Sequence, residues 1–147
     1  MVTFVVQPTL VEGSSMAPTL HPGERLVIEK VSYRFYAPQH GDVVVLKLPG
    51  RETTPLIKRV IATAGDIVAI REGIVYLNGA PLEESYLSTP FTDTFPSVVI
   101  PEGYLFVLGD NRGASKDSRA FGMIPLESLV GRATLRYWPL NSVGPVK

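Results

Sequence analysis

The sequence of 147 residues contains no cysteine and only two histidines. The lack of cysteine excludes disulfide bonds and a cysteine nucleophile, and it leaves the redox compartment open. His21 stands beside Pro22 and His40 stands before Gly41, so both lie in turn-like sequence where neither a Ser-His-Asp triad nor a zinc site is expected. A hydrolase made by this chain must therefore use a base other than histidine.

An excess of charge and a long apolar run are also missing. Lys and Arg together number 14, as do Asp and Glu, so no net basic field is present to hold a nucleic acid, and we expect no nucleic-acid partner. No run approaches the roughly 18–20 apolar residues that span a bilayer, and the short apolar start lacks the charge and cleavage site of a secretory signal. With 45% hydrophobic and 19% charged residues, the chain has the composition of a globular protein, and we expect one domain over residues 1–147.

What the sequence does contain is a series of short apolar, β-branched segments separated by turns. Glu72-Gly73 and Asn78-Gly79 are hairpin signals. The segment Pro81–Pro101 reads as a loop with one short strand at Val98–Ile100, and Pro125–Leu129 as a helical turn. The other expected strands cover 24–30, 42–48, 55–63, 66–71, 74–77, 104–108 and 130–138. This pattern predicts a mainly all-β protein of antiparallel sheets.

Three stretches carry residue types that suit catalysis. Val11–Leu20 places two serines in a Gly-Ser-Ser turn after an apolar lead-in, Ile57–Ile61 places Lys58 inside an apolar strand, and Gly109–Arg119 is a dense polar loop. Taken alone, the first stretch is an ordinary solvated loop, since such turns are common. A serine hydroxyl needs a neighbouring base to become a good nucleophile, and Lys58 is the candidate for that base.

Lys58 can act as a base only if its amine is neutral. Holding a lysine half neutral near pH 7.4 requires roughly 4 kcal/mol, which burial can supply. The two-residue period of a strand places Lys58 on one face with Leu56 and Val60, and Arg59 on the other face. The alternative is that Lys58 extends from a strand end into solvent.

In this order, the three stretches resemble the type I signal peptidases. Ser15–Leu20 matches the family's Ser-Met-x-Pro-Thr-Leu motif, Lys58-Arg59 its Lys-Arg strand, and Gly109–Arg119 its Gly-Asp-Asn-Arg loop. Gly41–Val45 also resembles the family's Gly-Asp-(Val/Ile)-Val strand. The resemblance implies coiled antiparallel sheets, of the type shared with SOS-repressor proteases, with one or two short helical turns and little or no extra cap region. Because the family usually carries membrane-spanning helices before the serine motif, it also implies a chain without its membrane anchor.

The same resemblance implies roles for individual residues. Ser15 is the expected nucleophile, Lys58 the general base, and Ser115 the residue that orients the lysine amine. The backbone N–H of Ser15 is an expected oxyanion donor; some members add a serine hydroxyl where this chain has Gly13, so Ser14 or another backbone N–H is left as the second donor. We expect neither a metal nor a cofactor. The loop's charged side chains are expected to form an ion-pair network, with an exposed charge run or a cation site as the alternative: Asp110, Arg112, Asp117 and Arg119.

The expected substrates are secreted preproteins, cut after a small-x-small sequence. An extended signal-peptide end would pair with strand edges around Leu10–Gly13, including Val11, and around Pro55–Lys58, including Ile57. The expected location is the extracytoplasmic face of the plasma membrane, with the chain as a monomer. Phe4–Val6 and the aromatic stretch Tyr33–Tyr36 are candidates for contact with the membrane surface, or else for core packing.

Two alternatives remain open at this point. A self-cleaving SOS-repressor-type protease also uses a Ser-Lys pair, but only 14 residues precede Ser15, with no helix-turn-helix and no Ala-Gly cleavage site. A non-catalytic β-rich binding module could use the loop Gly109–Arg119 to hold a ligand, but that alternative leaves Lys58 in an apolar run unexplained.

Overall fold

The structure is a computed structural model that describes residues 6–30, 37–50, 55–87 and 91–147. Phe4, Val5 and the stretch Tyr33–Tyr36, two parts of the predicted membrane contact, lie outside the described residues. Within the described part, no helix is both long enough and apolar enough to cross a membrane.

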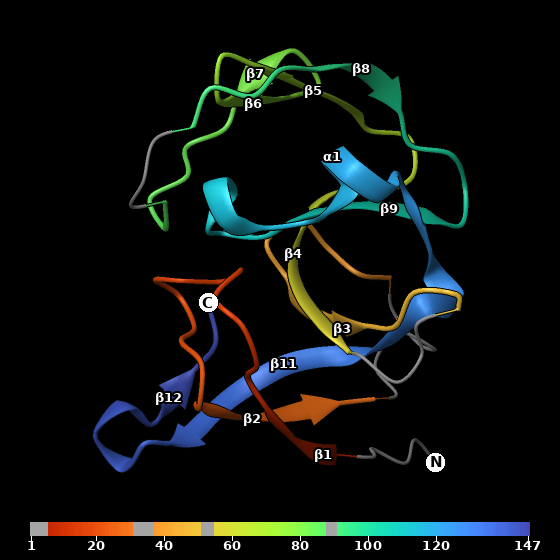
Figure 1. Cartoon of the computed structure of the whole chain (residues 1–147). Coiled ribbons are helices and arrows are strands. Elements are labelled where there is room, and N and C mark those ends of the chain that lie inside the picture. The colour runs from red at the N-terminus through yellow and green to blue at the C-terminus, as the bar shows by residue number, and fades with distance from the viewer. Residues whose placement is uncertain (1–5, 31–36, 51–54, 88–90) are drawn as a thin grey trace.

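The larger of two sheets has eight antiparallel strands and curls through the lower part of the molecule (Figure 1). Its strands follow one another in the order β1-β2-β11-β3-β4-β9-β10, and β12 pairs with β11. Strands that follow one another in the chain, such as β3 and β4, pair with each other, whereas β11 is inserted between β2 and β3. The bounds are β1 Val6–Leu10, β2 Arg25–Glu29, β3 Val43–Leu46, β4 Leu56–Ala62, β9 Tyr104–Leu108, β10 Ile124–Pro125, β11 Leu129–Trp138 and β12 Gly144–Pro145.

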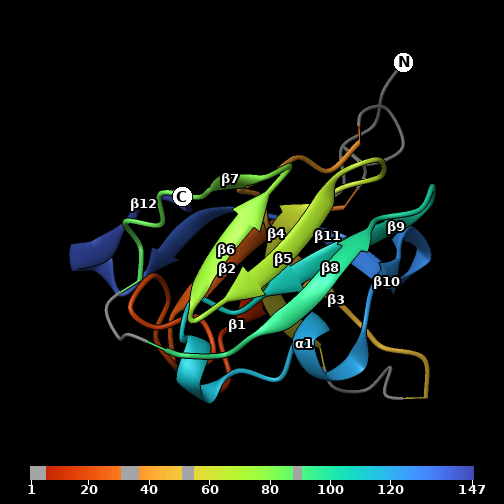
Figure 2. The same cartoon turned by 90° about the horizontal axis from the view of Figure 1, so that it is seen from above.

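The smaller sheet has the order β7-β6-β5-β8 and lies over the larger one, as the view from above shows (Figure 2). Glu72 and Asn78 have φ of 49° and 54°, and each is followed by a glycine with positive φ, so both predicted hairpin turns form as two-residue turns of the kind that Asn-Gly favours. The strands are β5 Ile67–Arg71, β6 Ile74–Leu77, β7 Ala80–Pro81 and β8 Phe95–Val99.

Among the residues that the structure describes, helical structure is limited to single turns. The predicted helical turn after Pro125 is the 3-10 helix η3, Leu126–Ser128. The α-helix α1, Ser118–Phe121, was not predicted, and the side chain of Asp117 caps it by accepting the Arg119 N–H. Two further 3-10 turns are η2, Arg112–Ala114, and η4, Leu140–Ser142. The prediction of coiled antiparallel sheets with short helical turns is confirmed.

The core consists of three groups of buried side chains on the faces of these sheets. The first lies between β2, β3 and the segment after β1 and contains Val11, Met16 and Ile57. The second joins the small sheet to β4 and β9 through Val68, Phe106 and their neighbours. The third contains Val60, Val44 and Val107. Ile57 and Ile61 place the first two groups on one face of β4 and Val60 places the third on the other, so this strand is covered on both sides, as a near-continuous apolar run requires.

Candidate active site

Ser15 and Lys58 come together although 43 positions separate them in the chain. Ser15 lies in the loop between β1 and β2, and Lys58 lies in β4. The Nζ of Lys58 donates a hydrogen bond of 2.9 Å to the Oγ of Ser15. The lysine is 3% exposed, so its alternative role as a solvent-facing side chain does not fit the structure.

The surroundings of Lys58 favour its neutral form. Burial lowers the pKa of the Lys58 amine, the negative charge of Asp117 raises it, and the positive charge of Arg119 lowers it again; the net pKa lies below the ordinary value. Leu56 and Val60 flank the lysine on the same strand face and belong to a buried apolar cluster. An amine with a lowered pKa next to a serine hydroxyl can accept the proton of that hydroxyl.

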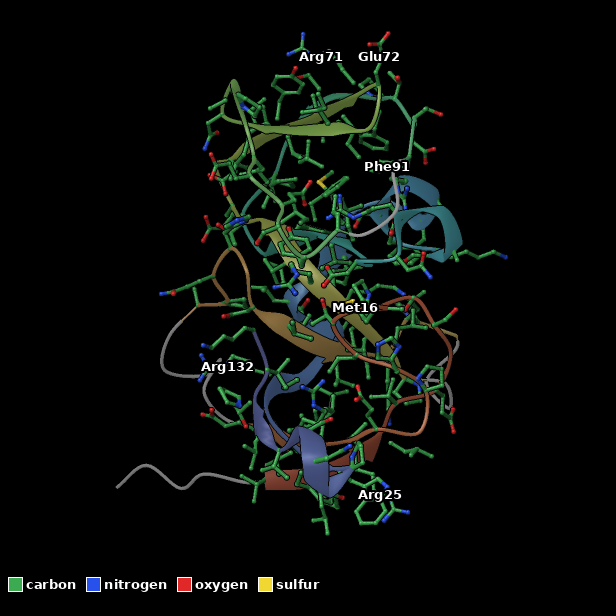
Figure 3. All side chains as sticks on the ribbon, turned by 90° about the vertical axis from the view of Figure 1, so that its left-hand side faces the viewer. Met16, Arg25, Arg71, Glu72, Phe91 and Arg132 are labelled. Atoms are coloured by element: carbon green, nitrogen blue, oxygen red, sulfur yellow. The ribbon has the colours of Figure 1, made fainter. Side chains whose placement is uncertain are left out.

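The loop after β9 holds the serine loop in place through the main chain. Asn111 donates its backbone N–H to the Ser15 carbonyl at 2.8 Å and its side-chain amide to the Ser14 carbonyl at 3.0 Å. The Asp110 N–H points at the sulfur of Met16 at 3.4 Å, and Met16 lies inside the molecule (Figure 3). The serine loop is therefore bound at three successive residues, at Ser14 and Ser15 through the backbone carbonyls and at Met16 through the side chain.

Gly109 makes this close approach possible. A Cβ at this position would lie 2.1 Å from the Ser115 Oγ and 2.6 Å from the Ser15 carbonyl oxygen, which is closer than real contacts allow. The three residues are thus packed around one point that has no room for a side chain. Only glycine fits there without a shift of the backbone.

A buried ion pair connects the lysine strand to the serine loop. Arg59 binds Asp110 with two hydrogen bonds, Nε to Oδ1 at 2.9 Å and Nη2 to Oδ2 at 2.7 Å. The Thr19 hydroxyl donates to the same carboxylate at 2.5 Å. Because Thr19 lies four residues after Ser15, Asp110 holds the serine loop and the strand β4 in one arrangement. A carboxylate bound by an arginine through two hydrogen bonds is also fixed in orientation.

The other three charged side chains of the predicted network also form hydrogen bonds, and some of their partners lie outside the loop. Asp117 is fully buried and accepts the Gly109 N–H at 3.0 Å and the Arg119 Nε at 2.8 Å. The Arg112 Nε donates to the Gly109 carbonyl at 2.7 Å. Among the described residues, no group of three or more His, Cys, Asp or Glu side chains is placed to hold a metal ion.

Ser115 lies at the site, but the hydrogen bond expected of it is not formed. Its Oγ is buried and makes no hydrogen bond, to Lys58 or to any other described residue. The hydroxyl packs against Gly109, beside the Ser15 carbonyl. The structure thus contains an unpartnered hydroxyl next to the nucleophile's loop.

The two segments that are expected to pair with substrate differ in whether their backbone groups are free to pair. At Val11 the expectation is not met, because the residue is buried and its N–H and C=O are already bonded to Glu24 and Gly23. Gly13 and Ser14, by contrast, are exposed, and Gly13 has a φ of 77°. The open part of this segment is therefore the exposed stretch after Val11, together with the outer edge of β1.

Ile57 lies on an open edge of β4. The N–H and C=O of Val60 bond to Asp42 and Gly41, so they face β3. Backbone groups of successive strand residues point to opposite sides, so those of Ile57 face away from β3. On that side the pairing with β9 begins only at Arg59, which leaves the Ile57 N–H and C=O at an unpaired edge among the described strands.

Several residues of the site were not predicted from the sequence. Arg59, Thr19 and Asn111 were visible as members of the matched motifs, but their partners are far apart in the chain. Glu84 and Asp93, which bind Arg112 and Arg119, lie in a segment that reads only as a loop. No local pattern indicates that such carboxylates reach an active site.

A serine hydroxyl bonded to a buried lysine amine, carried on curled antiparallel sheets, is an arrangement that suits a serine peptidase using lysine in place of histidine. Residues 1–138 match the family described as signal peptidase, peptidase S26. The chain is 43% identical to the probable signal peptidase I-1 of Synechocystis, with 96% of this chain and 76% of that protein covered. The chain belongs to the signal peptidase family, and its activity is that of a hydrolase that removes signal peptides.

Relatives from other sources agree with this assignment. The chain is 38% identical to signal peptidase IB of Staphylococcus aureus, over 94% of this chain and 81% of the relative. It is also 38% identical to thylakoidal processing peptidase 1 of Arabidopsis thaliana, over 95% of this chain and 44% of that protein. A crystal structure of a signal peptidase I from Enterococcus faecalis matches with a TM-score of 0.58 at 33% identity, over 65% of this chain and 95% of the other.

Proposed function

We propose that Ser15 is the nucleophile and Lys58 the general base of signal-peptide removal. The observation that carries this proposal is the 2.9 Å hydrogen bond between the Lys58 Nζ and the Ser15 Oγ, made by a lysine that is 3% exposed. Histidine does not serve here: His21 and His40 are both exposed, and the His40 Nδ1 lies 2.8 Å from the Ile61 carbonyl oxygen. The neutral lysine amine is the base within reach of the hydroxyl.

The reaction then follows two steps. In the first, the Ser15 Oγ attacks the carbonyl carbon of the peptide bond while the Lys58 amine takes the hydroxyl proton. The resulting ammonium gives that proton to the departing amine of the mature protein, which leaves the signal peptide as an ester on Ser15. In the second, the neutral lysine activates a water molecule that hydrolyses the ester and restores both residues.

The negative charge on the tetrahedral intermediate requires hydrogen-bond donors. The Ser15 backbone N–H is the first donor, since it makes no hydrogen bond among the described residues. Gly13 offers no side chain, and the exposed Ser14 hydroxyl is the side-chain candidate for the second donor. The bonds from Asn111 to the Ser14 and Ser15 carbonyls fix the peptide plane that presents these donors.

Ser115 is proposed to orient the lysine once substrate is bound. A buried hydroxyl without a partner is destabilising, so the Ser115 Oγ is ready to accept or donate a hydrogen bond when the lysine amine moves. The buried pairs of Asp110, Arg112, Asp117 and Arg119 hold the loop that carries it.

The substrate is proposed to bind as an extended strand along the open edge of β4 at Ile57. Alternate side chains of such a strand point to the same side, which suits recognition of two residues with one residue between them. Small residues at those two positions fit because the neighbouring interior is already filled by Met16 and Leu20, at 2% and 1% exposure. This supports a cut after a small-x-small sequence.

We also propose that the chain works at a membrane surface. Leu10, Arg25 and Trp138 are paired across β1, β2 and β11, so their side chains share the sheet face opposite the buried Leu26 and Ile28. That outer face and the turn after β11 expose large apolar side chains, called here the apolar face: Val6, Leu10, Leu135, Trp138, Leu140 and Val143. A patch of this kind suits a lipid boundary.

The extracytoplasmic side is proposed for the site because signal peptides are cut there as preproteins emerge. A monomer is proposed because one chain supplies the serine, the lysine and the residues that hold them.

Replacing Ser15 by Ala tests the proposal. The variant should keep the melting temperature of the wild type, since a half-exposed turn hydroxyl adds little stability, and it should lose cleavage of a preprotein in detergent. Residual cleavage above roughly one part in a thousand of the wild-type rate would exclude Ser15 as the nucleophile.

A further inference from the structure

Three arginines surround the catalytic residues, and all three have partners in the connection between two strands of the small sheet. Arg59 follows Lys58 in β4, and Arg112 and Arg119 lie on either side of Ser115. Their partners come from the connection between β7 and β8, and they are called here the arginine clamp: Glu84, Tyr86, Phe91 and Asp93.

The contacts of the clamp are close and mostly buried. Glu84 accepts two hydrogen bonds from Arg112, at 2.6 Å and 3.2 Å, and their side chains are 6% and 0% exposed. The Arg59 guanidinium lies 4.0 Å from the centre of the Tyr86 ring, within the range of a cation–π contact. The Tyr86 hydroxyl donates to Glu84 at 2.6 Å. These contacts join Glu84, Tyr86 and two arginines into one buried cluster.

Phe91 and Asp93 extend the clamp to the third arginine. The Phe91 ring lies 5.5 Å from the Arg112 guanidinium carbon and 5.6 Å from that of Arg119, and Figure 3 shows Phe91 beside the loop that carries them. Asp93 binds Arg119 at 2.9 Å, but its side chain is 54% exposed, so this pair contributes little. The buried half of the clamp, Glu84 and Tyr86, therefore carries the inference.

The small sheet holds the clamp in position. Gly73, in the β5–β6 turn, donates its N–H to the Asp93 carbonyl at 3.0 Å, and a Cβ at Gly73 would meet the Phe91 carbonyl at 1.8 Å. On the other side, the Leu82 N–H bonds to the Val75 carbonyl at 2.9 Å. Both ends of the clamp are thus bonded to β6 and its turn.

Two chains of contacts run from the clamp to the nucleophile. Glu84 holds Arg112, the Arg112 Nε holds the Gly109 carbonyl, and Gly109 packs against Ser115 and the Ser15 carbonyl. On the other path, Tyr86 covers Arg59, which binds Asp110, and Asp110 binds Thr19 in the serine loop.

We propose that Glu84 and Tyr86 are positioning residues for the Ser15–Lys58 pair, so that the small sheet is a working part of the active site. The inference rests on the proposed function, because it assumes that these two residues carry the reaction. Glu84 supplies the buried negative charge that orients Arg112, and Tyr86 supplies the flat surface that orients Arg59. Burial, followed by the hydrogen bond to Glu84, raises the pKa of the Tyr86 phenol, which keeps it a neutral donor.

The test compares Glu84→Gln with Glu83→Gln. Both remove one carboxylate charge from adjacent positions, but Glu83 is exposed and takes part in none of the ion pairs, side-chain hydrogen bonds or ring contacts of the clamp. With a preprotein substrate, Glu84→Gln should lower kcat at least tenfold with KM within about twofold, and Glu83→Gln should leave both unchanged. Because a loosened loop admits water to Lys58, the rising limb of the rate–pH profile should also move to higher pH in Glu84→Gln alone.

Tyr86 gives a second test that does not depend on a charge. Tyr86→Phe keeps the ring over Arg59 and loses the hydrogen bond to Glu84, whereas Tyr86→Leu loses both. The expected order of kcat is wild type, then Phe, then Leu. If Glu84→Gln does not fold, the comparison of Tyr86→Phe with Tyr86→Leu tests the positioning role instead.

Other outcomes of these measurements would contradict the positioning role of Glu84 and Tyr86. Folded Glu84→Gln and Tyr86→Leu with kcat within twofold of wild type would remove both residues from the active site. A lower rate that matches a lower folded fraction in near-ultraviolet circular dichroism, with an unmoved pH limb, would assign them to stability alone. Ser15→Ala is measured in parallel: if it still cleaves, the proposed function fails, whereas an inactive Ser15→Ala beside a fully active Glu84→Gln contradicts only the clamp.

Discussion

At Lys58, folding and catalysis make opposite demands on one side chain. A lysine that is 3% exposed must lose its charge or find a partner for it, and its hydrogen bond goes to a neutral hydroxyl. Asp117 raises its pKa only against the larger effect of burial. The Lys58 amine is thus suited to act as the proposed base because it lies where its charged form is disfavoured.

Replacing Lys58 by Arg separates a base from a structural cation. A guanidinium stays protonated in proteins and offers no lone pair, so Lys58→Arg should cleave a preprotein no faster than Lys58→Ala. Circular dichroism and melting should show that both variants fold. Substantial turnover by the Arg variant, or a wild-type rate that does not rise with pH between about 6 and 10, would contradict the proposed Ser-Lys pair.

The lowered pKa of Lys58 also predicts a cost in stability. In the unfolded chain the lysine titrates near its ordinary value of about 10.4, so below that pH the unfolded state binds more protons than the folded state. Stability therefore rises with pH between the lowered pKa and about 10.4. Lys58→Met should have a larger free energy of unfolding than wild type at pH 7, with the gain shrinking towards pH 10.

Urea unfolding at several pH values measures this difference. Lys116→Met is the control, because Lys116 is exposed and its charge stays in water in both states. A gain for Lys58→Met that is the same at pH 7 and pH 10 would show that packing, and not the buried amine, accounts for it.

Gly109→Ala should damage the site from the main chain. The added methyl group would meet the Ser115 hydroxyl and the Ser15 carbonyl, so the serine loop must shift, and we expect kcat to fall at least tenfold with a lower melting temperature. Gly113→Ala, four residues later, adds a methyl group that meets no atom within 4 Å. If the two variants behave alike, the tight packing at Gly109 has no functional role.

At the scale of elements, the sequence predicted most strands because their apolar residues alternate with turn residues. The strands β2, β3, β4, β9 and β11 all lie within the predicted ranges or within one residue of them. The strand β8 begins at Phe95, three residues before the predicted Val98, because pairing with β5 overrides the weak local signal of a segment that contains Pro96. The one-turn helix α1 depends on a cap and has no apolar periodicity to reveal it.

The open edge of β4 makes a prediction about the substrate backbone. If the signal peptide pairs with the Ile57 N–H and C=O, only alternate substrate amides face β4. In a series of peptides that are each N-methylated at one position before the cut, methylation should raise KM about tenfold at one position and little at the next. Equal effects at neighbouring positions would argue against strand pairing.

At the scale of the whole molecule, the sequence predicted that Ser15 and Lys58 come together, which the structure confirms, but not the structure that holds them. Ser15 and Lys58 follow from motifs whose residues are local in the chain. The partners of Asp110 and Arg112, by contrast, are Arg59 and Glu84, which lie 51 and 28 positions away. Such partners depend on how the two sheets meet, and no short segment carries that information.

The apolar face predicts binding to lipid vesicles. Trp138 is the only tryptophan of the chain, so its fluorescence should shift to shorter wavelength when vesicles of phosphatidylcholine and phosphatidylglycerol are added. Leu140→Ser should weaken binding by about tenfold, since burying a leucine is worth roughly 1.5–3 kcal/mol. Val99→Ser removes an apolar group of the small sheet that is also exposed, at 61% against 75% for Leu140, and should have no effect. An unchanged spectrum in vesicles would rule out this face as the membrane contact.

The position of β11 determines when, during synthesis, the protein can become a peptidase. Ser15 follows β1 and Lys58 lies in β4, and in the large sheet these two halves are joined only through β11, which pairs with β2 on one side and β3 on the other. A ribosome makes β11 after every other part of the site, including Ser115. The nascent chain therefore lacks the strand that joins β2 to β3 until residues 129–138 have been made. We therefore expect cleavage activity to appear only once β11 has joined the sheet.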